Sequence, residues 1–449
     1  MRSAVPIVAG ALALAVCIIA VGPSLTILLV AGLAVIAIAW RKPLLSGGLW
    51  WAVVAIVPTW IGIGFAGSQF VMGSVLALVL LFGVLAAPGP RARVNALDVA
   101  MMVLIGTMVL ALLFDGSRSL ANDSIMQWGL PYLLLRFVSL RTSDASLGKM
   151  IIGVGLLCAA WAVVEFLFGF HIYETMQLPG SLMNLQEIWQ SIQTRAGVAR
   201  AEGAFGTSIS LAGFLALAIP YALQLRLPAM LVTLGILGAG MVCTLARTGA
   251  VAAGIMIALI LIMRVQKYRP ALTVAFLIGA LYVAPIVTGT GVNQDLATDF
   301  SDSSGYRDYV FATAFGLTVP FGPANEMAGF SYVSVDNAYL RLALDSGQVP
   351  AAALVLVFVV ALVAYLRYRQ GQALVASIAM GASLYVVALI TQWQMFIFAV
   401  LGIAATEIQR AREARERAAV GLPVSIDGQA PQMVAPGSTR SKMKSAIRR

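Results

Sequence analysis

Long apolar runs recur along the chain, and they constrain its fold more than any other feature of the sequence. Crossing about 30 Å of hydrocarbon takes roughly 20 residues of helix, and nearly every run reaches that length. Inside lipid the backbone has to satisfy its own hydrogen bonds, so such runs form helices. Of all residues 60% are hydrophobic and 11% charged, and the mean hydropathy is +0.92, values that exclude an ordinary soluble domain. The sequence therefore predicts an all-α, polytopic transmembrane helical bundle.

The apolar runs predict twelve to fourteen membrane spans. The fourteen segments are 4–22, 24–40, 48–66, 69–87, 97–114, 124–140, 149–169, 206–224, 228–246, 248–264, 270–288, 349–367, 373–390 and 391–407. The first segment has the apolar character of a signal peptide. However, Arg2 is the only cation before it and Pro23 leads directly into the next span, so we expect a retained hairpin.

The distribution of charge predicts the orientation in the membrane. With the N-terminus in the cytoplasm, all lysines and most arginines fall in cytoplasmic loops or in the C-terminal tail, as the positive-inside rule requires. Both termini are therefore predicted to be cytoplasmic. Six cations remain on the outer side, and all are arginines: Arg118, Arg195, Arg200, Arg247, Arg307 and Arg341. Arginine suits bidentate binding of phosphate, so an anionic ligand is expected at the outer face.

Two predicted external loops, 170–205 and 289–348, are longer than the others. In the first, apolar residues at helical spacing over 181–192 predict an amphipathic helix, which either lies in the outer interface or caps the bundle. The second is expected to be ordered and catalytic, because loops of this length are usually functional or disordered. It contains two predicted short helices, over 306–312 and 336–344.

The C-terminal end has a different character from the domain 1–407. Arg/Glu pairs over 408–419 extend the last helix, and the rest of the tail, to residue 449, is predicted to be mostly disordered. Its basic residues favour the anionic cytoplasmic leaflet. They are expected to determine topology and not to bind nucleic acid.

Several kinds of site are excluded by the residues present. The single histidine and three dispersed cysteines give no zinc or haem ligand set, so no metal and no cofactor are expected. His171 lies among aromatic residues at a membrane exit and is interpreted as part of the interfacial belt. No ATP-binding or nucleophile-elbow motif occurs. Ionisable residues deep in the spans are nearly missing, since Arg136 and Glu165 lie toward span ends. An acidic, arginine-bearing outer surface above apolar spans suits a lipid phosphate.

Four short motifs follow one another around the predicted external loops. They are Arg200-Ala-Glu-Gly203-Ala-Phe-Gly206; Thr244-Leu-Ala-Arg247-Thr-Gly249-Ala250; Ser304-Gly-Tyr-Arg307 with Pro320-Phe-Gly322; and Asp336-Asn337-Ala-Tyr339-Leu340 before Gly347. In order and spacing they resemble the O-antigen ligase and O-antigen polymerase family over about residues 195–400. The N-terminal half is similar to that family only in hydropathy.

The resemblance implies a metal-independent membrane glycosyltransferase of the GT-C type. Such an enzyme transfers a glycan from an undecaprenyl diphosphate carrier to a glycan or other acceptor at the outer face of the inner membrane. The family's diphosphate-contacting arginines match Arg200, Arg247 and Arg307. The alternatives are that Arg247 completes the dipole of the span 228–246, and that Arg200 and Arg307 form surface salt bridges to Glu202 and Asp308.

One position departs from the ligases of this family, which carry His where this chain has Asp336. Asp336 is either the base that activates the acceptor hydroxyl or the N-cap of a helix. The change favours a polymerase, or a ligase with another acceptor. Tyr339 is interpreted as a packing or sugar-stacking residue, and Arg341 as an accessory contact.

The sequence therefore predicts glycan transfer in the polymerisation or ligation of a surface polysaccharide (O-antigen, capsule or exopolysaccharide). Other polysaccharide-assembly proteins are possible partners beside the lipid bilayer. The alternative is a flippase for lipid-linked oligosaccharide, which would require a hydrophilic groove through apolar spans. A non-catalytic scaffold is a third class, and it would tolerate substitution of the arginines.

Overall fold

The computed structural model describes residues 23–65, 68–174, 176, 194–195, 198–264, 313–324, 337–385 and 392–420. The chain divides into two compact units, Met1–Ile408 and Gln409–Arg449. The predicted spans 4–22 and 270–288, the helices over 181–192 and 306–312, Arg307 and Asp336 all lie outside the described residues.

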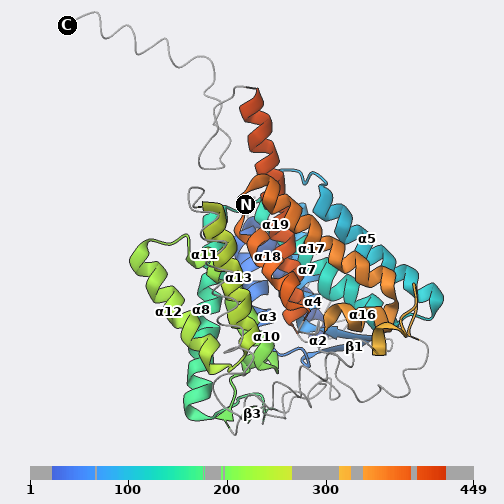
Figure 1. The fold of residues 1–449 in the computed structure, drawn as a ribbon, viewed down its shortest axis with the longest axis horizontal. Coiled ribbons are helices and arrows are strands. Elements are labelled where there is room, and N and C mark those ends of the chain that lie inside the picture. Colours follow the sequence, from blue (N-terminus) through green and yellow to red (C-terminus); the bar gives the residue numbers. More distant parts are fainter. Residues whose placement is uncertain are drawn as a thin grey trace, which may run out of the picture. The chain divides into compact units, whose positions relative to one another are not determined.

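The described part of the first unit is built almost entirely of helices, as predicted (Figure 1). The helices are α2 (Pro23–Arg41), α3 (Pro43–Ile56), α4 (Met72–Ala86), α5 (Ala96–Ala111), α6 (Arg118–Asp123), α7 (Leu130–Leu140), α8 (Asp144–Phe168), α10 (Ser208–Leu217), α11 (Ile219–Ala222), α12 (Leu227–Cys243), α13 (Arg247–Arg264), α16 (Ala338–Ser346), α17 (Gln348–Tyr368), α18 (Gln372–Ser383) and α19 (Trp393–Ala419). A π-helical turn, η2 (Ser124–Gly129), joins α6 to α7, and the short 3-10 helices are η1 (Leu112–Phe114) and η3 (Gly203–Phe205). The strands pair as two antiparallel hairpins, β1 (Gly62–Phe65) with β2 (Ser68–Val71) and β3 (Thr194–Arg195) with β4 (Val198–Ala199).

Three helices in the described part of the chain are long and apolar enough to cross a membrane: Ala96–Phe114, Asp144–Phe168 and Gln348–Tyr368. Seven shorter apolar helices of 10–17 residues accompany them there. At 1.5 Å per residue, each of these is shorter than the roughly 30 Å of hydrocarbon in a bilayer.

The predicted span 48–66 is wrong in both position and length. The helix there is α3, which begins at Pro43 and ends at Ile56, and the chain continues into the β1–β2 hairpin. Pro58 explains the early end: the residue before a proline is driven out of the helical region, and Val57 is extended at φ −96° and ψ 119°. The apolar character of residues 57–65 thus belongs to a loop and a strand of the hairpin.

Helix α19 forms much of the core of the first unit. A helix that is apolar on all sides is expected to be buried, and every residue from Trp393 to Ala405 is buried. The Phe396 ring lies 4.9 Å from the Trp51 ring and 4.5 Å from the Phe214 ring, which joins α19 to α3 and α10. In the second unit α19 continues to Ala419, as its Arg/Glu spacing predicted; Arg412 pairs with Glu416 at 2.8 Å.

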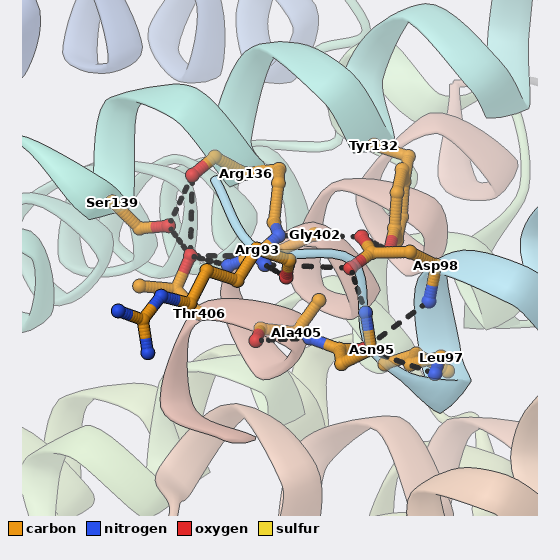
Figure 2. A network of polar contacts seen from close by, with 10 residues as sticks. All are labelled: Arg93, Asn95, Leu97, Asp98, Tyr132, Arg136, Ser139, Gly402, Ala405 and Thr406. Carbon is orange, nitrogen blue, oxygen red and sulfur yellow. Dashed lines mark hydrogen bonds and ion pairs between the residues drawn. The ribbon is translucent and has the colours of Figure 1, made fainter. Parts of the chain in front are cut away.

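A buried polar network joins the start of α5, the end of α7 and the middle of α19 (Figure 2). Arg136 is 1% exposed and lies 3.3 Å from the Asp98 carboxylate, its ion-pair partner. It also donates to Thr406 Oγ1 at 3.0 Å and to the Arg93 carbonyl at 3.1 Å. Asp98 in turn accepts from the Tyr132 hydroxyl and from the Asn95 backbone at 2.9 Å. The charge of Arg136 is thus compensated within the bundle.

Candidate functional site

The first two motifs of the family resemblance lie against each other. Arg200 Nε donates a hydrogen bond to the Thr244 carbonyl at 3.0 Å, and the backbone N–H of Ala201 donates to the Cys243 carbonyl at 3.1 Å. Both contacts join residues more than forty positions apart in the sequence. The segment Arg200–Gly203, called the Arg200 turn below, therefore packs against the connection between α12 and α13.

That connection is a tight turn made by its own residues. The Thr244 hydroxyl donates to the Met241 carbonyl at 2.6 Å and accepts from the backbone N–H of Ala246 at 3.2 Å. Leu245 adopts the left-handed conformation at φ 50°. Arg247 follows as the first residue of α13.

One alternative role of the arginines fits this geometry poorly. The preceding helix α12 ends at Cys243, so Arg247 does not stand in its last turn, where a cation would complete the helix dipole. Glu202, the salt-bridge partner predicted for Arg200, is 5% exposed.

The backbone at the end of the Arg200 turn binds a buried carboxylate from another helix. Glu165, in the last turn of α8, is 3% exposed. Its Oε2 accepts from the backbone N–H of Gly203 at 2.8 Å, and its Oε1 accepts from the backbone N–H of Glu202 at 3.3 Å. Gly203 has φ 55°, a left-handed conformation that glycine adopts without steric cost.

His171 is the third partner of this carboxylate: its Nδ1 pairs with Glu165 Oε1. The interpretation of His171 as an interfacial belt residue is therefore wrong, because its side chain is 8% exposed and ion-paired. The bond to Glu165 is the main influence on the imidazole and raises its pKa, against the opposing effect of burial; Glu202 and Glu174 raise it further.

A small cavity opens beside this pair. It has a volume of about 10 Å³, room for about one water molecule, and its walls include Glu165, His171 and the aromatic residues Trp161 and Tyr173. The two aromatic rings are stacked, with centroids 5.9 Å apart. Tyr173 donates its hydroxyl to the Ile56 carbonyl, and burial raises its pKa to about 12, so it remains a neutral donor.

The described parts of the third and fourth motifs, Pro320–Gly322 and the segment from Asn337 to Gly347, also lie together. The backbone N–H of Gly322 donates to the Ser346 carbonyl at 3.0 Å, and that of Gln348 donates to the Val319 carbonyl at 2.8 Å. Gly347 has φ 107°, and a Cβ there would lie 2.6 Å from Phe321 Cα. Only glycine allows the turn between α16 and α17 to pass this close to the Pro320–Gly322 backbone.

The N-cap of α16 is Asn337, whose side chain accepts from the backbone N–H groups of Tyr339 and Leu340, both at 3.0 Å. The described cap of this helix is thus Asn337, and both interpretations of Asp336, as base and as cap, concern a residue outside the described ones.

The two other candidate residues of α16 make contacts of their own. Tyr339 donates to the Gly381 carbonyl at 2.6 Å, a packing contact between α16 and α18. Arg341 forms an ion pair with Asp345, one turn further along the same helix.

Both motif clusters are attached to the connection between α18 and α19. Ala338 donates its backbone N–H to the Leu384 carbonyl at 2.9 Å, and Gln392 donates its side-chain amide to the Ala204 carbonyl at 2.6 Å. Figure 1 shows α16, β1 and β3 at one end of the bundle. The structure thus brings the described parts of the motifs to the end that the charge distribution predicts to face outward.

Sequence reasoning missed the Glu165–His171 pair, although a signal was present. His171 is the only histidine of the chain, and Glu165 is an acid at the end of an otherwise apolar span. Gly169 between them has φ 60°, a left-handed C-terminal cap that turns the chain back toward the helix end. Within the described residues no group of three His, Cys, Asp or Glu side chains could hold a metal ion.

Comparison with family models gave no matching family, and neither the curated proteins nor the solved structures gave a match.

Proposed function

We propose that this protein is a multi-pass membrane glycosyltransferase. It transfers a glycan from an undecaprenyl diphosphate carrier to a glycan or other acceptor, in polymerisation or ligation of a surface polysaccharide. The reaction takes place at the outer face of the inner membrane. The shorter apolar helices cross the membrane together with the three long ones, and both termini are cytoplasmic.

The contact between the Arg200 turn and the α12–α13 turn is the observation that carries this proposal. It supports an anion site because it holds two arginine-bearing backbone segments side by side at a helix bundle end. Each phosphate group of a diphosphate can accept two parallel hydrogen bonds from one guanidinium group. The apolar helix surfaces below would accommodate the polyprenyl chain.

The proposed chemistry is electrostatic. As the bond between the sugar and the diphosphate breaks, negative charge grows on the leaving phosphate oxygen. Arg200, Arg247 and Arg307 would stabilise that charge, and fixed cations in a partly dry site are effective at this task. The mechanism needs neither a metal ion nor a nucleotide sugar.

The test is to replace Arg247 or Arg307 by Ala in the producing organism and to follow the surface polysaccharide by gel electrophoresis. Chain growth or attachment should fall at least about 100-fold, the usual effect of removing one stabilising group from a transition state. Protein levels in the membrane should be unchanged.

Arg118→Ala is the matched control, since Arg118 is exposed and begins the separate helix α6. Normal polysaccharide in both the Arg247 and the Arg307 variants would overturn the proposal. Deletion of the gene should also identify the reaction: single repeat units on the carrier lipid indicate a polymerase, and full polymers on the carrier indicate a ligase.

A further inference from the structure

The pairing of Glu165 with His171 fixes both the tautomer and the direction of the imidazole ring. The carboxylate is itself immobilised by the backbone N–H groups of Glu202 and Gly203. Because Nδ1 faces Glu165, Nε2 is the nitrogen left to accept a proton. This is the division of roles in carboxylate–histidine catalytic pairs, in which the carboxylate orients the ring and stabilises the imidazolium.

His171 lies at the wall of a small cavity. Among the described residues none forms a hydrogen bond with its Nε2 atom, and the ring lines the small cavity beside Trp161. The cavity has room for about one water molecule, which is also the size of a hydroxyl group. The stacked rings of Trp161 and Tyr173 form an aromatic part of the cavity wall.

The pair is built on the same turn as a candidate diphosphate ligand. Glu202 and Gly203, which hold Glu165, follow Arg200 by two and three residues. A proton acceptor and a cation for the leaving group are therefore linked through one short segment of backbone.

We propose that His171, oriented by Glu165, is the base that removes the proton from the acceptor hydroxyl in the transfer reaction. This inference rests on the proposed function and deepens it. The acceptor oxygen forms a bond to the anomeric carbon, and the bond between that carbon and the phosphate oxygen breaks. The leaving diphosphate takes the electron pair, and the hydroxyl proton moves to His171 Nε2 and from there to water. Glu165 is a positioning residue in this scheme.

The surroundings of His171 predict how the reaction depends on pH. Three carboxylates act on the ring: Glu165 in α8, Glu174 just after it and Glu202 in the Arg200 turn. They raise its pKa above 6.5, with the hydrogen bond to Glu165 as the largest cause. A base must be deprotonated to act, so transfer should increase as the pH rises through this raised value.

The experiment measures initial transfer rates from about pH 5.5 to 9, a range that brackets a perturbed histidine. The protein is reconstituted in liposomes with the carrier-linked glycan extracted from cells that lack the gene. His171→Asn keeps an amide donor for Glu165 but has no titrating base. It should lose transfer at least about 100-fold, as is typical when a general base is removed.

Two further variants separate catalysis from folding. Glu165→Gln should move the pH-dependent limb to lower pH by about one unit, because the charge that favours the imidazolium is gone. Phe170→Leu, next to His171 in the sequence and 60% exposed, should transfer at the wild-type rate. Binding of undecaprenyl diphosphate and the unfolding temperature are measured for every variant.

The outcomes distinguish the two proposals. Loss of transfer in His171→Asn with carrier binding retained, together with the shifted limb in Glu165→Gln, supports the assignment. Transfer by His171→Asn within threefold of wild type, with the same pH dependence, overturns it and leaves the proposed function standing. If the wild-type protein itself neither binds the carrier nor transfers glycan, the proposed function fails and the assignment fails with it.

Discussion

At the scale of single residues, buried charge determines how much a substitution destabilises the protein. Arg136 is 1% exposed and forms an ion pair with Asp98. Asp98 has further donors, because Tyr132 and the backbone of Asn95 also bond its carboxylate. The two halves of the ion pair are therefore not equivalent.

Replacing Asp98 by Asn should destabilise the protein more than replacing Arg136 by Met. The first change removes a carboxylate that pairs with a buried guanidinium, and breaking a buried pair in this way costs about 3–5 kcal/mol. The double variant should be more stable than Asp98→Asn alone, since it removes the buried guanidinium as well. Unfolding temperatures of the purified proteins in detergent measure this order, and equal losses in the two single variants would contradict it.

At the scale of elements, small residues determine how closely the helices approach. Gly249, in the first turn of α13, is buried against α10, and a Cβ at this position would lie 2.5 Å from Ala212 Cβ and 2.9 Å from the Ala212 carbonyl carbon. Backbone cannot move aside as a flexible side chain does. This glycine belongs to the second motif of the resemblance, and its role in the structure is helix packing.

Gly249→Ala should lower the free energy of unfolding by about 1–3 kcal/mol, the usual effect of overpacking. Gly254→Ala on the same helix is the matched control, because nothing lies within 4 Å of a Cβ there. Its stability should be unchanged or slightly higher, since alanine is the better helix former. A loss in both variants would indicate an effect on the helix itself instead of on its contact with α10.

At the scale of the whole molecule, the described parts of the motifs gather at one end of the first unit. Helices α5 and α17 pack against each other, and the polar network of Asp98 and Arg136 lies at the beginning of α5, the end opposite to η1. The distribution of lysine and arginine predicts that the motif end faces outward and the network end faces the cytoplasm.

Single cysteines introduced at exposed positions test this orientation, in a background without the native cysteines. Ser119→Cys in α6 should react with a membrane-impermeant maleimide in intact spheroplasts. Gln370→Cys, in the connection between α17 and α18, should react only after permeabilisation. Both residues are exposed, so accessibility to the reagent depends on the membrane. The reverse pattern would invert the predicted topology, and with it the proposed location of the reaction.

Sequence alone determined the helical class and the approximate positions of the helices. A long apolar run indicates that the segment lies in hydrocarbon. Hydrocarbon offers no hydrogen-bond partners, so a single segment can satisfy its backbone N–H and C=O groups only as a helix. The predicted helix positions failed only locally. At Pro58, for example, the proline ends the helix although the apolar run continues. The cap of α16 could not be chosen from sequence, because Asp and Asn are both good N-cap residues, and the structure has Asn337 in that role.

Only the tertiary structure decided which side chains meet. Arg136 reaches Thr406 across 270 positions, and the Arg200 turn reaches Thr244 across 44; neither pairing leaves a periodic signal, because it arises from packing between separate helices. Glu165 and His171 are close in sequence, yet their bond depends on the left-handed turn at Gly169 and on the backbone donors of Glu202 and Gly203. Hydrophobicity fixes where a chain becomes helical, whereas the positions of its few buried polar groups are fixed by the partners that folding brings to them.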